Sequence, residues 1–415
     1  MLVFWLIVGA LVAFDLAWWA WGDWRLRRLR GSAAWRAGFC AFMAIQAVGF
    51  WVLFGYRMIG REDPLPTVMQ AAVYVWHLVV APASIVLLVA GGVGWAAVSA
   101  VRWALSGVKA SAAAAAGVDG EAGPPSRDEP AAQGPTRRDV ILAGLAAVPP
   151  VVTAAGVGVG LTQLQGFRIR RMELEIPNLP DALDGLSIAH VSDIHAGRFT
   201  PPEKMSLIVE QTNALEPDLV LLTGDIIDFH LSDLPRTIEM IHRLRPKAGM
   251  FLCEGNHDLI EDREAFEYQV RRAMLPLLLN ESHTIRVGRQ AVQVLGLRWG
   301  FAGAGRGAFV DENTRMIAGM IRPDAFPILL AHHPHAFDLA AEAGIPLTLA
   351  GHTHGGQLML NERLGAGSIM FKYWSGLYRK GNSSLVVSNG VGNWFPLRVN
   401  APAEIIHLRL KRRTA

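Results

Sequence analysis

The sequence predicts an α/β domain preceded by an all-α membrane region of about four transmembrane helices. The chain has 415 residues, of which 51% are hydrophobic, and the long apolar stretches gather at 1–165. From residue 166 to 415, short apolar runs of strand length alternate with stretches of helical spacing. This alternation is typical of an α/β fold with largely buried sheets.

Four apolar stretches are long enough to cross a bilayer, which takes about 20 residues. They lie at 2–22, 34–56, 68–100 and 140–162. The third is longer than needed, so we expect it to tilt or to kink near Pro82. The fourth contains Pro149 and Pro150, which a helix bundle tolerates. Asp15 inside the first stretch either pairs with His77 of the third or is hydrogen-bonded otherwise within the bundle.

Loop charge predicts the orientation of these spans, because basic loops stay in the cytoplasm. The loop after the first span carries one acid and five arginines: Arg25, Arg27, Arg28, Arg30 and Arg36. With this loop inside, the amino terminus lies outside and the fourth span leads out again. We therefore expect a multi-pass protein of a bacterial-type inner (cytoplasmic) membrane, with the domain at 166–415 extracytoplasmic.

The third loop, at 103–139, is rich in Ala, Gly and Pro and predicts a flexible linker. Its end leads into "TRRDVILAGLAA", which either resembles a twin-arginine export signal or simply places Arg137 and Arg138 at the cytoplasmic end of a helix. Both interpretations put the following domain outside. The amino terminus lacks a basic start, so we expect no cleaved signal peptide.

Charge and cysteine content exclude several classes of protein. The net charge is only +3, which predicts no nucleic-acid partner. The only cysteines are Cys40 and Cys253, too few and too far apart for a disulfide framework or a zinc–thiolate site. We interpret both as small buried hydrophobic residues.

Polar clusters follow five apolar runs in the second part of the chain. "GLSIAHV" precedes "SDIHAG", "PDLVLL" precedes "TGDIID", "GMFLC" precedes "EGNHD", "FPILLA" precedes "HHPHAF", and "IPLTLA" precedes "GHTHGG". In α/β sheets, ligands bind beyond the carboxyl ends of strands. Any one cluster alone could be a helix cap, a turn or a solvated loop. Five in succession predict a common site.

The candidate metal ligands are Asp193, His195, Asp225, Asn256, His332, His352 and His354. Asp and His with one Asn and no Cys suit Mn, Fe or Zn better than calcium or a structural zinc. Seven ligands exceed what one tetrahedral ion needs, and they fit two divalent metal ions that share a carboxylate. The glycines beside them allow tight turns that aim the side chains into one centre.

These motifs in this order (Asp-x-His, Gly-Asp, Gly-Asn-His-Asp, a His after a strand, Gly-His-x-His) resemble the calcineurin-like metallophosphoesterase superfamily over about 185–360. "VSDIHAGRF" and "AGHTHGGQL" resemble its membrane-tethered phosphodiesterase branch, which includes UDP-diacylglucosamine hydrolases. The resemblance implies a four-layer αββα sandwich over 166–415. An extracytoplasmic domain conflicts with a cytoplasmic role in lipid A synthesis, so we do not assign that activity.

The resemblance also implies roles for the site residues. One metal would be held by Asp193, His195 and His354, and the other by Asn256, His332 and His352, with Asp225 bridging both. His257 would be the catalytic histidine and Asp258 its orienting partner. His332 is preferred to His333 and His335 because it directly follows the apolar run. Arg198 either contacts phosphate or is a solvated surface residue.

The expected function is that of a membrane-anchored dinuclear phosphoesterase that uses metal-activated hydroxide. Its substrate would be a phosphodiester, phosphomonoester or pyrophosphate, with a lipid or an envelope polymer as candidate carriers, and no obligate protein partner is evident. The alternative is a catalytically retired metal-binding sensor or presentation module at the membrane. A channel or transporter has only Asp15 in its favour. Aromatic residues at 371–378 and around Trp394 belong either to the core or to a lipid-facing groove.

Overall fold

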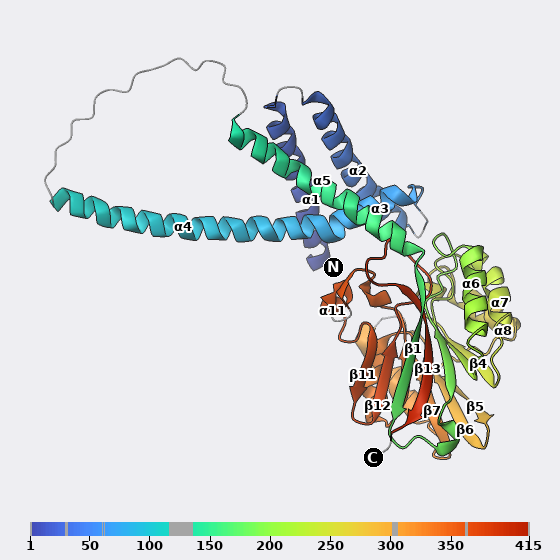
Figure 1. The fold of residues 1–415 in the computed structure, drawn as a ribbon. Coiled ribbons are helices and arrows are strands. Elements are labelled where there is room, and N and C mark those ends of the chain that lie inside the picture. Colours follow the sequence, from blue (N-terminus) through green and yellow to red (C-terminus); the bar gives the residue numbers. More distant parts are fainter. Residues whose placement is uncertain are drawn as a thin grey trace. The chain divides into compact units, whose positions relative to one another are not determined.

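The computed structural model describes residues 2–29, 32–59, 61, 63–115, 136–300, 306–361 and 364–413. They divide into two compact units, Met1–Gly158 and Val159–Ala415 (Figure 1). The division falls inside a helix, slightly before the boundary at 165/166 expected from the sequence.

The first unit is helical throughout its described elements. Its helices are α1 (Leu2–Arg27), α2 (Ala33–Met58), α3 (Thr67–Val75), a π-helical turn (Trp76–Val80), α4 (Ala81–Ala115) and α5 (Arg137–Leu164). Four segments are long and apolar enough to cross a membrane: Trp5–Arg27, Ala33–Tyr56, Thr67–Ala96 and Asp139–Leu164. The prediction of four apolar helices is therefore confirmed.

The third span contains an irregularity at its proline. The π-helical turn Trp76–Val80 ends just before Pro82. A proline donates no hydrogen bond and its ring crowds the carbonyl four residues earlier, which loosens the preceding turn. The linker expected at 103–139 differs from its prediction in part, because residues 103–115 continue helix α4. Residues 116–135 lie outside the described residues.

A buried polar cluster joins the first and third spans. The Asp15 carboxylate accepts a hydrogen bond from Trp76 Nε1 at 2.7 Å, and its other oxygen lies 2.9 Å from His77 Nε2. His77 Nδ1 lies 2.9 Å from the carbonyl oxygen of Val73. Because a carbonyl only accepts, this nitrogen carries a proton. Of the two alternatives for Asp15, the structure has the pair with His77.

The second unit contains two mixed sheets. The first has the strand order β1-β13-β2-β3-β4, and the second has the order β11-β12-β8-β7-β6-β5. The strands of the first are β1 (Phe167–Ile176), β2 (Ser187–Val191), β3 (Leu219–Thr223), β4 (Gly249–Cys253) and β13 (Ala403–Arg412). Those of the second are β5 (Glu281–Val287), β6 (Gln290–Gly296), β7 (Ala325–Leu330), β8 (Leu347–Ala350), β11 (Gly376–Lys380) and β12 (Ser383–Val387). A short hairpin, β9 (Met359–Asn361) with β10 (Leu364–Gly365), stands apart.

The central strands of both sheets run parallel and are buried on both faces. β2, β3 and β4 are parallel neighbours in the first sheet, as are β6, β7 and β8 in the second. Every residue of β2, β3, β7 and β8 is buried. This explains why these strands are continuous apolar runs rather than alternating ones.

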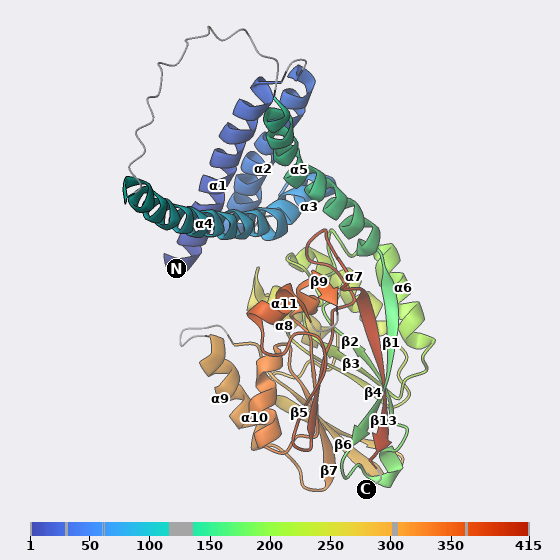
Figure 2. The same cartoon turned by 60° about the vertical axis from the view of Figure 1, so that its left-hand side comes forward.

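Helices cover the outer faces, which gives four layers and confirms the predicted αββα architecture (Figure 2). One core cluster lies between the sheets and includes Leu221 of β3 and Ile328 of β7. A second packs the first sheet against α6 (Pro202–Asn213), α7 (Leu234–His242) and α8 (Arg263–Arg272). A third packs the second sheet against α9 (Arg306–Ala318) and α10 (Phe337–Glu342). Parallel strand ends from both sheets thereby meet at one edge of the sandwich.

Candidate metal centre

The predicted ligands follow the carboxyl ends of five strands. Asp193 and His195 follow β2, Asp225 follows β3, and Asn256 follows β4. His332 follows β7, while His352 and His354 follow β8. These strands are buried apart from their ends, so the sheets fix the positions of the ligand residues that follow them.

The structure brings these side chains together into groups that could hold metal ions. Within the described residues, three groups have donor atoms within 4.8 Å of one another: Asp193, His195 and His354; Asp225, His332 and His352; and His195, Asp225 and His257. The first contains the three residues that the resemblance assigns to one metal, and the second contains His332 and His352, assigned to the other metal, together with Asp225. Asp225 and His195 each occur in two of the three groups.

The Asp225 carboxylate lies between the two groups. Its Oδ2 atom is 3.5 Å from His195 Nε2 and 3.1 Å from His332 Nε2. The same His332 nitrogen is 3.2 Å from Asn256 Oδ1 and 3.2 Å from His352 Nδ1. A single carboxylate oxygen therefore faces ligands from both sheets.

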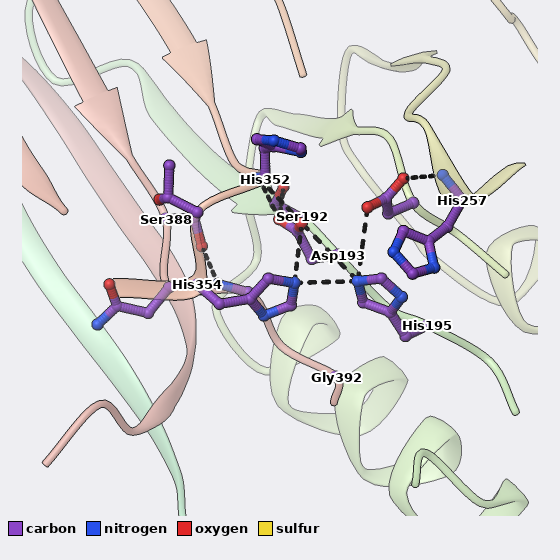
Figure 3. A network of polar contacts seen from close by, with 12 residues as sticks. Ser192, Asp193, His195, His257, His352, His354, Ser388 and Gly392 are labelled. Atoms are coloured by element: carbon purple, nitrogen blue, oxygen red, sulfur yellow. Dashed lines mark hydrogen bonds and ion pairs between the residues drawn. The ribbon is translucent and has the colours of Figure 1, made fainter. Parts of the chain in front are cut away.

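The group of Asp193, His195 and His354 is centred on the Asp193 carboxylate (Figure 3). His354 Nε2 is 3.2 Å from Asp193 Oδ1 and 2.9 Å from His195 Nε2. The second Asp193 oxygen accepts a hydrogen bond from the Ser192 hydroxyl, and the backbone amide of His352 donates to the carboxylate at 2.9 Å. Two imidazole nitrogens and a carboxylate converge here, and no cationic side chain lies between them. This donor set fits a divalent ion.

The backbone at the site adopts conformations that ordinary residues avoid. Five of the seven candidate ligands have positive φ angles: Asp193 (54°), His195 (46°), Asp225 (51°), His352 (70°) and His354 (51°). Such angles cost a non-glycine residue about 1 kcal/mol or more and concentrate at functional sites. We infer that the surrounding fold imposes them in order to aim these side chains inward.

Two glycines allow the chain to pass this close to the ligands. A Cβ atom on Gly351 would lie 2.1 Å from Asp193 Oδ2, and one on Gly255 would lie 2.2 Å from Asp225 Oδ1. Both distances are far below van der Waals contact. Any side chain at either position would therefore displace a candidate ligand.

Hydrogen bonds fix which ring nitrogen of His332 faces the centre. His332 Nδ1 lies 2.7 Å from the Thr223 carbonyl oxygen, which can only accept. Nδ1 therefore carries a proton, and Nε2 is the ring nitrogen that faces the site. Such a carbonyl partner is typical of histidines that bind metals.

Burial and neighbouring charges shift the pKa values of these groups in opposite directions. Burial alone would raise the pKa of Asp193, but His354 and His332 outweigh it and hold the pKa below its usual range. Burial opposes the charged form of His332, yet Asp225 raises its pKa to about 9. Burial also lowers the pKa of His352 to about 3 and that of His354 to about 4. The Asp193 carboxylate is thus ionised near neutral pH, and the imidazoles of His352 and His354 are neutral, as metal ligands must be. His332 is protonated in the metal-free protein and would have to lose its second proton when a metal binds.

His257 lies at the edge of the ligand set, with its side chain 20% exposed. Its backbone amide donates to Asp225 Oδ1 at 2.8 Å, and its Nδ1 lies 2.6 Å from the Asp228 carbonyl oxygen. Burial would lower its pKa, but the Asp225 and Asp228 carboxylates raise it to about 9. His257 is therefore protonated near neutral pH in the metal-free protein.

The expected partner of His257 differs from the one in the structure. Asp258, predicted to orient His257, instead accepts hydrogen bonds from the backbone amides of Ile226, Ile227 and Gly255 at 2.7, 3.1 and 2.8 Å. Its carboxylate closes the turns that follow β3 and β4, so it cannot also turn toward the imidazole. Burial raises its pKa to about 7.

Asp228 contacts His257 instead, and the sequence analysis missed it. Its Oδ1 lies 3.3 Å from His257 Nδ1 and 3.2 Å from His195 Nδ1, so one carboxylate contacts both rings. Burial would raise its pKa, but hydrogen bonds to the two histidines lower it to about 2. Its place three residues after Asp225 in "TGDIID" was the available signal.

Arg398 is a second residue that sequence reasoning missed. It is fully buried, and its Nη2 lies 3.3 Å from His354 Nδ1. The same guanidinium donates to the backbone carbonyls of Asn389, Gly392 and Ala401, and Nε donates to Asn393 Oδ1. Arg398 thereby holds the loops around His354 together.

Aromatic rings surround the ligand histidines. The Trp299 ring lies 5.3 Å from that of His352, the Phe371 ring lies 5.8 Å from the same imidazole, and the Trp394 ring lies 6.0 Å from that of His257. Arg198 is exposed, with its guanidinium carbon 5.5 Å from the Phe199 ring centroid, and its contact with phosphate stays a prediction.

The chain is similar to known metallophosphoesterases. A family model described as calcineurin-like phosphoesterase matches residues 186–356. A "Transmembrane protein with metallophosphoesterase domain" of Danio rerio is 30% identical over 69% of this chain and 66% of its own length. "Uncharacterized metallophosphoesterase YkuE" of Bacillus subtilis is 27% identical over 66% of this chain and 98% of its own.

"Phosphodiesterase YaeI" of Escherichia coli is 27% identical over 54% of this chain and 81% of its own length. Among solved structures, Haemophilus influenzae NAD nucleotidase is similar at a TM-score of 0.34, with 15% identity over 49% of this chain and 45% of its own. The chain spans slightly less than two thirds of the length of the zebrafish relative.

Proposed function

We propose that this protein, whose residues 186–356 match the calcineurin-like phosphoesterase family model, is a membrane-anchored, dinuclear, metal-dependent phosphoesterase. Its substrate would be a phosphodiester, phosphomonoester or pyrophosphate. The observation that supports this most directly is the position of Asp225 Oδ2, within 3.5 Å of His195 and 3.1 Å of His332. One carboxylate shared by two groups of ligands is the arrangement that a pair of cations requires.

The ligand set suits two divalent ions such as Mn, Fe or Zn. Asp193, His195 and His354 would hold one, Asn256, His332 and His352 the other, and Asp225 both. When bound, the ions would lower the pKa of a shared water and stabilise charge on the phosphoryl oxygens. The nitrogen and oxygen donors do not distinguish among these metals.

The chain itself supplies an acid for the departing oxygen. His257 Nδ1 is held by the Asp228 carbonyl at 2.6 Å, so Nε2 is the atom available to donate a proton. A positioned general acid typically contributes about 10²–10⁴ in rate. Asp228 acts as a positioning residue, because it contacts the rings of both His195 and His257.

We further propose that this domain lies outside the cytoplasm, at the inner membrane of a bacterial-type cell. The support is the arginine-rich loop after the first span and the even number of apolar helices that precede the domain. Twin-arginine export at "TRRDVILAGLAA" would give the same placement.

The test uses the full chain, purified in detergent and loaded separately with Mn, Fe, Co or Zn. Turnover of bis(p-nitrophenyl) phosphate or p-nitrophenyl phosphate is expected with at least one metal, and it should be lost in Asp225→Asn. Absence of turnover with every metal would refute the proposal. Stoichiometric metal binding without turnover would instead favour the retired metal-binding sensor.

A further inference from the structure

The last turn of α5 is built into the α/β domain rather than merely connected to it. Within the unit Val159–Ala415, the Gly160 carbonyl accepts from the Arg398 amide at 3.3 Å, and the Leu164 carbonyl accepts from Asn393 Nδ2 at 3.2 Å. A Cβ atom on Gly160 would overlap the Leu397 side chain at 1.8 Å. The helix end therefore packs directly on the segment 393–400.

This segment also borders the candidate metal centre. Arg398 contacts His354 at 3.3 Å, and the Trp394 ring lies 6.0 Å from that of His257. Because Asp139–Leu164 is long and apolar enough to cross a membrane, its end at Leu164 would lie at a bilayer surface. The segment 393–400 would then connect that surface to the centre.

The β9–β10 hairpin is attached to the same place. The amide of Asn400 donates to Gln163 Oε1 at 2.7 Å, and its side chain donates to the Met359 carbonyl at 3.2 Å. Asn400 thus joins the end of α5 to the first residue of the hairpin. The hairpin continues into α11 (Ala366–Met370), whose first amide donates to the Leu358 carbonyl at 2.9 Å.

The hairpin and α11 carry large apolar side chains in solvent. Leu360 is 72% exposed, Leu364 51%, Ile369 86% and Met370 73%. Single exposed apolar residues are ordinary, but a group of them marks an interaction surface. We call these four residues the apolar rim. Phe371, which follows them, lies 5.8 Å from the His352 ring and 6.0 Å from the His333 ring.

We propose that the apolar rim inserts into the surface of the lipid bilayer and that the adjoining centre hydrolyses phosphoesters carried by membrane lipids. The partner is a bilayer because the rim is joined through Asn400 to the end of a helix that itself has the length and composition of a membrane span. The lipid substrate rests on the proposed function, whereas the insertion of the rim does not. The reaction adds one water across the phosphorus–oxygen bond: hydroxide goes to phosphorus, and the departing oxygen takes the proton.

Insertion is tested without any reference to activity. Full chain carrying Cys40→Ser and Ile369→Cys is labelled with an environment-sensitive fluorophore and reconstituted in phosphatidylcholine nanodiscs with spin-labelled lipid. Met274→Cys, 87% exposed on the same unit, is the matched control. We expect lipid quenching and a blue shift at 369 and neither at 274. Equal signals at both positions would overturn the proposal. Disulfide cross-linking between two chains of the unlabelled Ile369→Cys variant would also overturn it, in favour of a dimer.

The substrate class is tested by a ratio of rates. Metal-loaded full chain in nanodiscs is assayed on bis(p-nitrophenyl) phosphate, and on phosphatidic acid and phosphatidylglycerol supplied in the same discs. In Ile369→Ser/Met370→Ser the ratio of lipid to soluble turnover should fall at least about tenfold, because two apolar anchors are lost. Tyr268→Ser/Met274→Ser should keep the wild-type ratio. Soluble turnover without lipid turnover, or an unchanged ratio in the rim variant, would overturn the lipid substrate. If the wild-type protein does not hydrolyse bis(p-nitrophenyl) phosphate, the proposal that it is a phosphoesterase is refuted.

Discussion

Replacement of Asp228 by asparagine separates the role of its charge from that of its shape. Asp228 Oδ1 lies 3.2 Å from His195 Nδ1 and 3.3 Å from His257 Nδ1, and asparagine keeps the size of the side chain. In the metal-free protein the pKa of His257 rises from 6.5 to about 9. That difference corresponds to about 3 kcal/mol.

The raised pKa has two sources, since burial works against it and Asp225 contributes together with Asp228. We therefore expect Asp228→Asn to lower the pKa of His257 by at least about one unit, or about 1.4 kcal/mol. In the loaded enzyme, the loss of a carboxylate partner behind a ligand histidine typically costs about 10–100-fold in metal affinity or activity.

The assay combines three measurements on full chain in detergent. Histidine NMR follows the titration of His257 without metal, calorimetry gives the Kd for Mn, and kcat/KM is measured at saturating metal. Asp324→Asn is the control, because its carboxylate is 63% exposed and paired with Arg322. If Asp228→Asn leaves the pKa of His257 unchanged, and the Kd and kcat/KM within twofold of wild type, the role given to Asp228 is wrong.

Three further predictions concern stability and placement. Asp258→Ala should lower the free energy of unfolding by at least about 3 kcal/mol, because three buried amides lose their acceptor; a denaturant titration that gives less than about 1 kcal/mol would contradict this. Burial lowers the pKa of Lys204 to about 7 from 10.5. Between pH 7 and 10.5 the folded protein therefore binds fewer protons than the unfolded chain. In this range the free energy of unfolding should rise with pH by up to about 1.4 kcal/mol per pH unit. Lys204→Met should remove that slope in thermal melts between pH 7 and 10, whereas the exposed Lys247→Met should retain it, and a retained slope in Lys204→Met would assign it to another group. Alkaline phosphatase fused after residue 170 should be active, and green fluorescent protein fused at the same place should not fluoresce. The reverse pattern would place the domain in the cytoplasm.

The sequence predicted the fold and the convergence of the ligands for one physical reason. Strands buried on both faces are continuous apolar runs, so β2, β3, β4, β7 and β8 could be recognised by their composition. Each is followed within three residues by Asp, Asn or His, and parallel strand ends meet at one edge. The positions of these side chains therefore required no knowledge of tertiary contacts.

What the sequence did not predict depends on contacts between loops. Asp258 is next to His257 in the chain, but its side chain turns back to the amides after β3 and β4, while Asp228 reaches His257 from the neighbouring loop. Arg398 reaches His354 from 44 residues away. Adjacency in sequence suggested the wrong partner because a turn of 3₁₀ helix, His257–Leu259, sends consecutive side chains in different directions.

The positive φ angles of five donor residues bear on how readily one ion replaces another. A metal site whose backbone already has the conformation of the bound state needs little rearrangement when a cation binds. Neither binding nor release then has to wait for the chain to move. The site also has little freedom to contract or expand around a preferred ionic radius. Which first-row metal occupies such a site would then follow the supply in the surrounding compartment more than any preference of the protein, and growth medium should change the metal content of the purified chain.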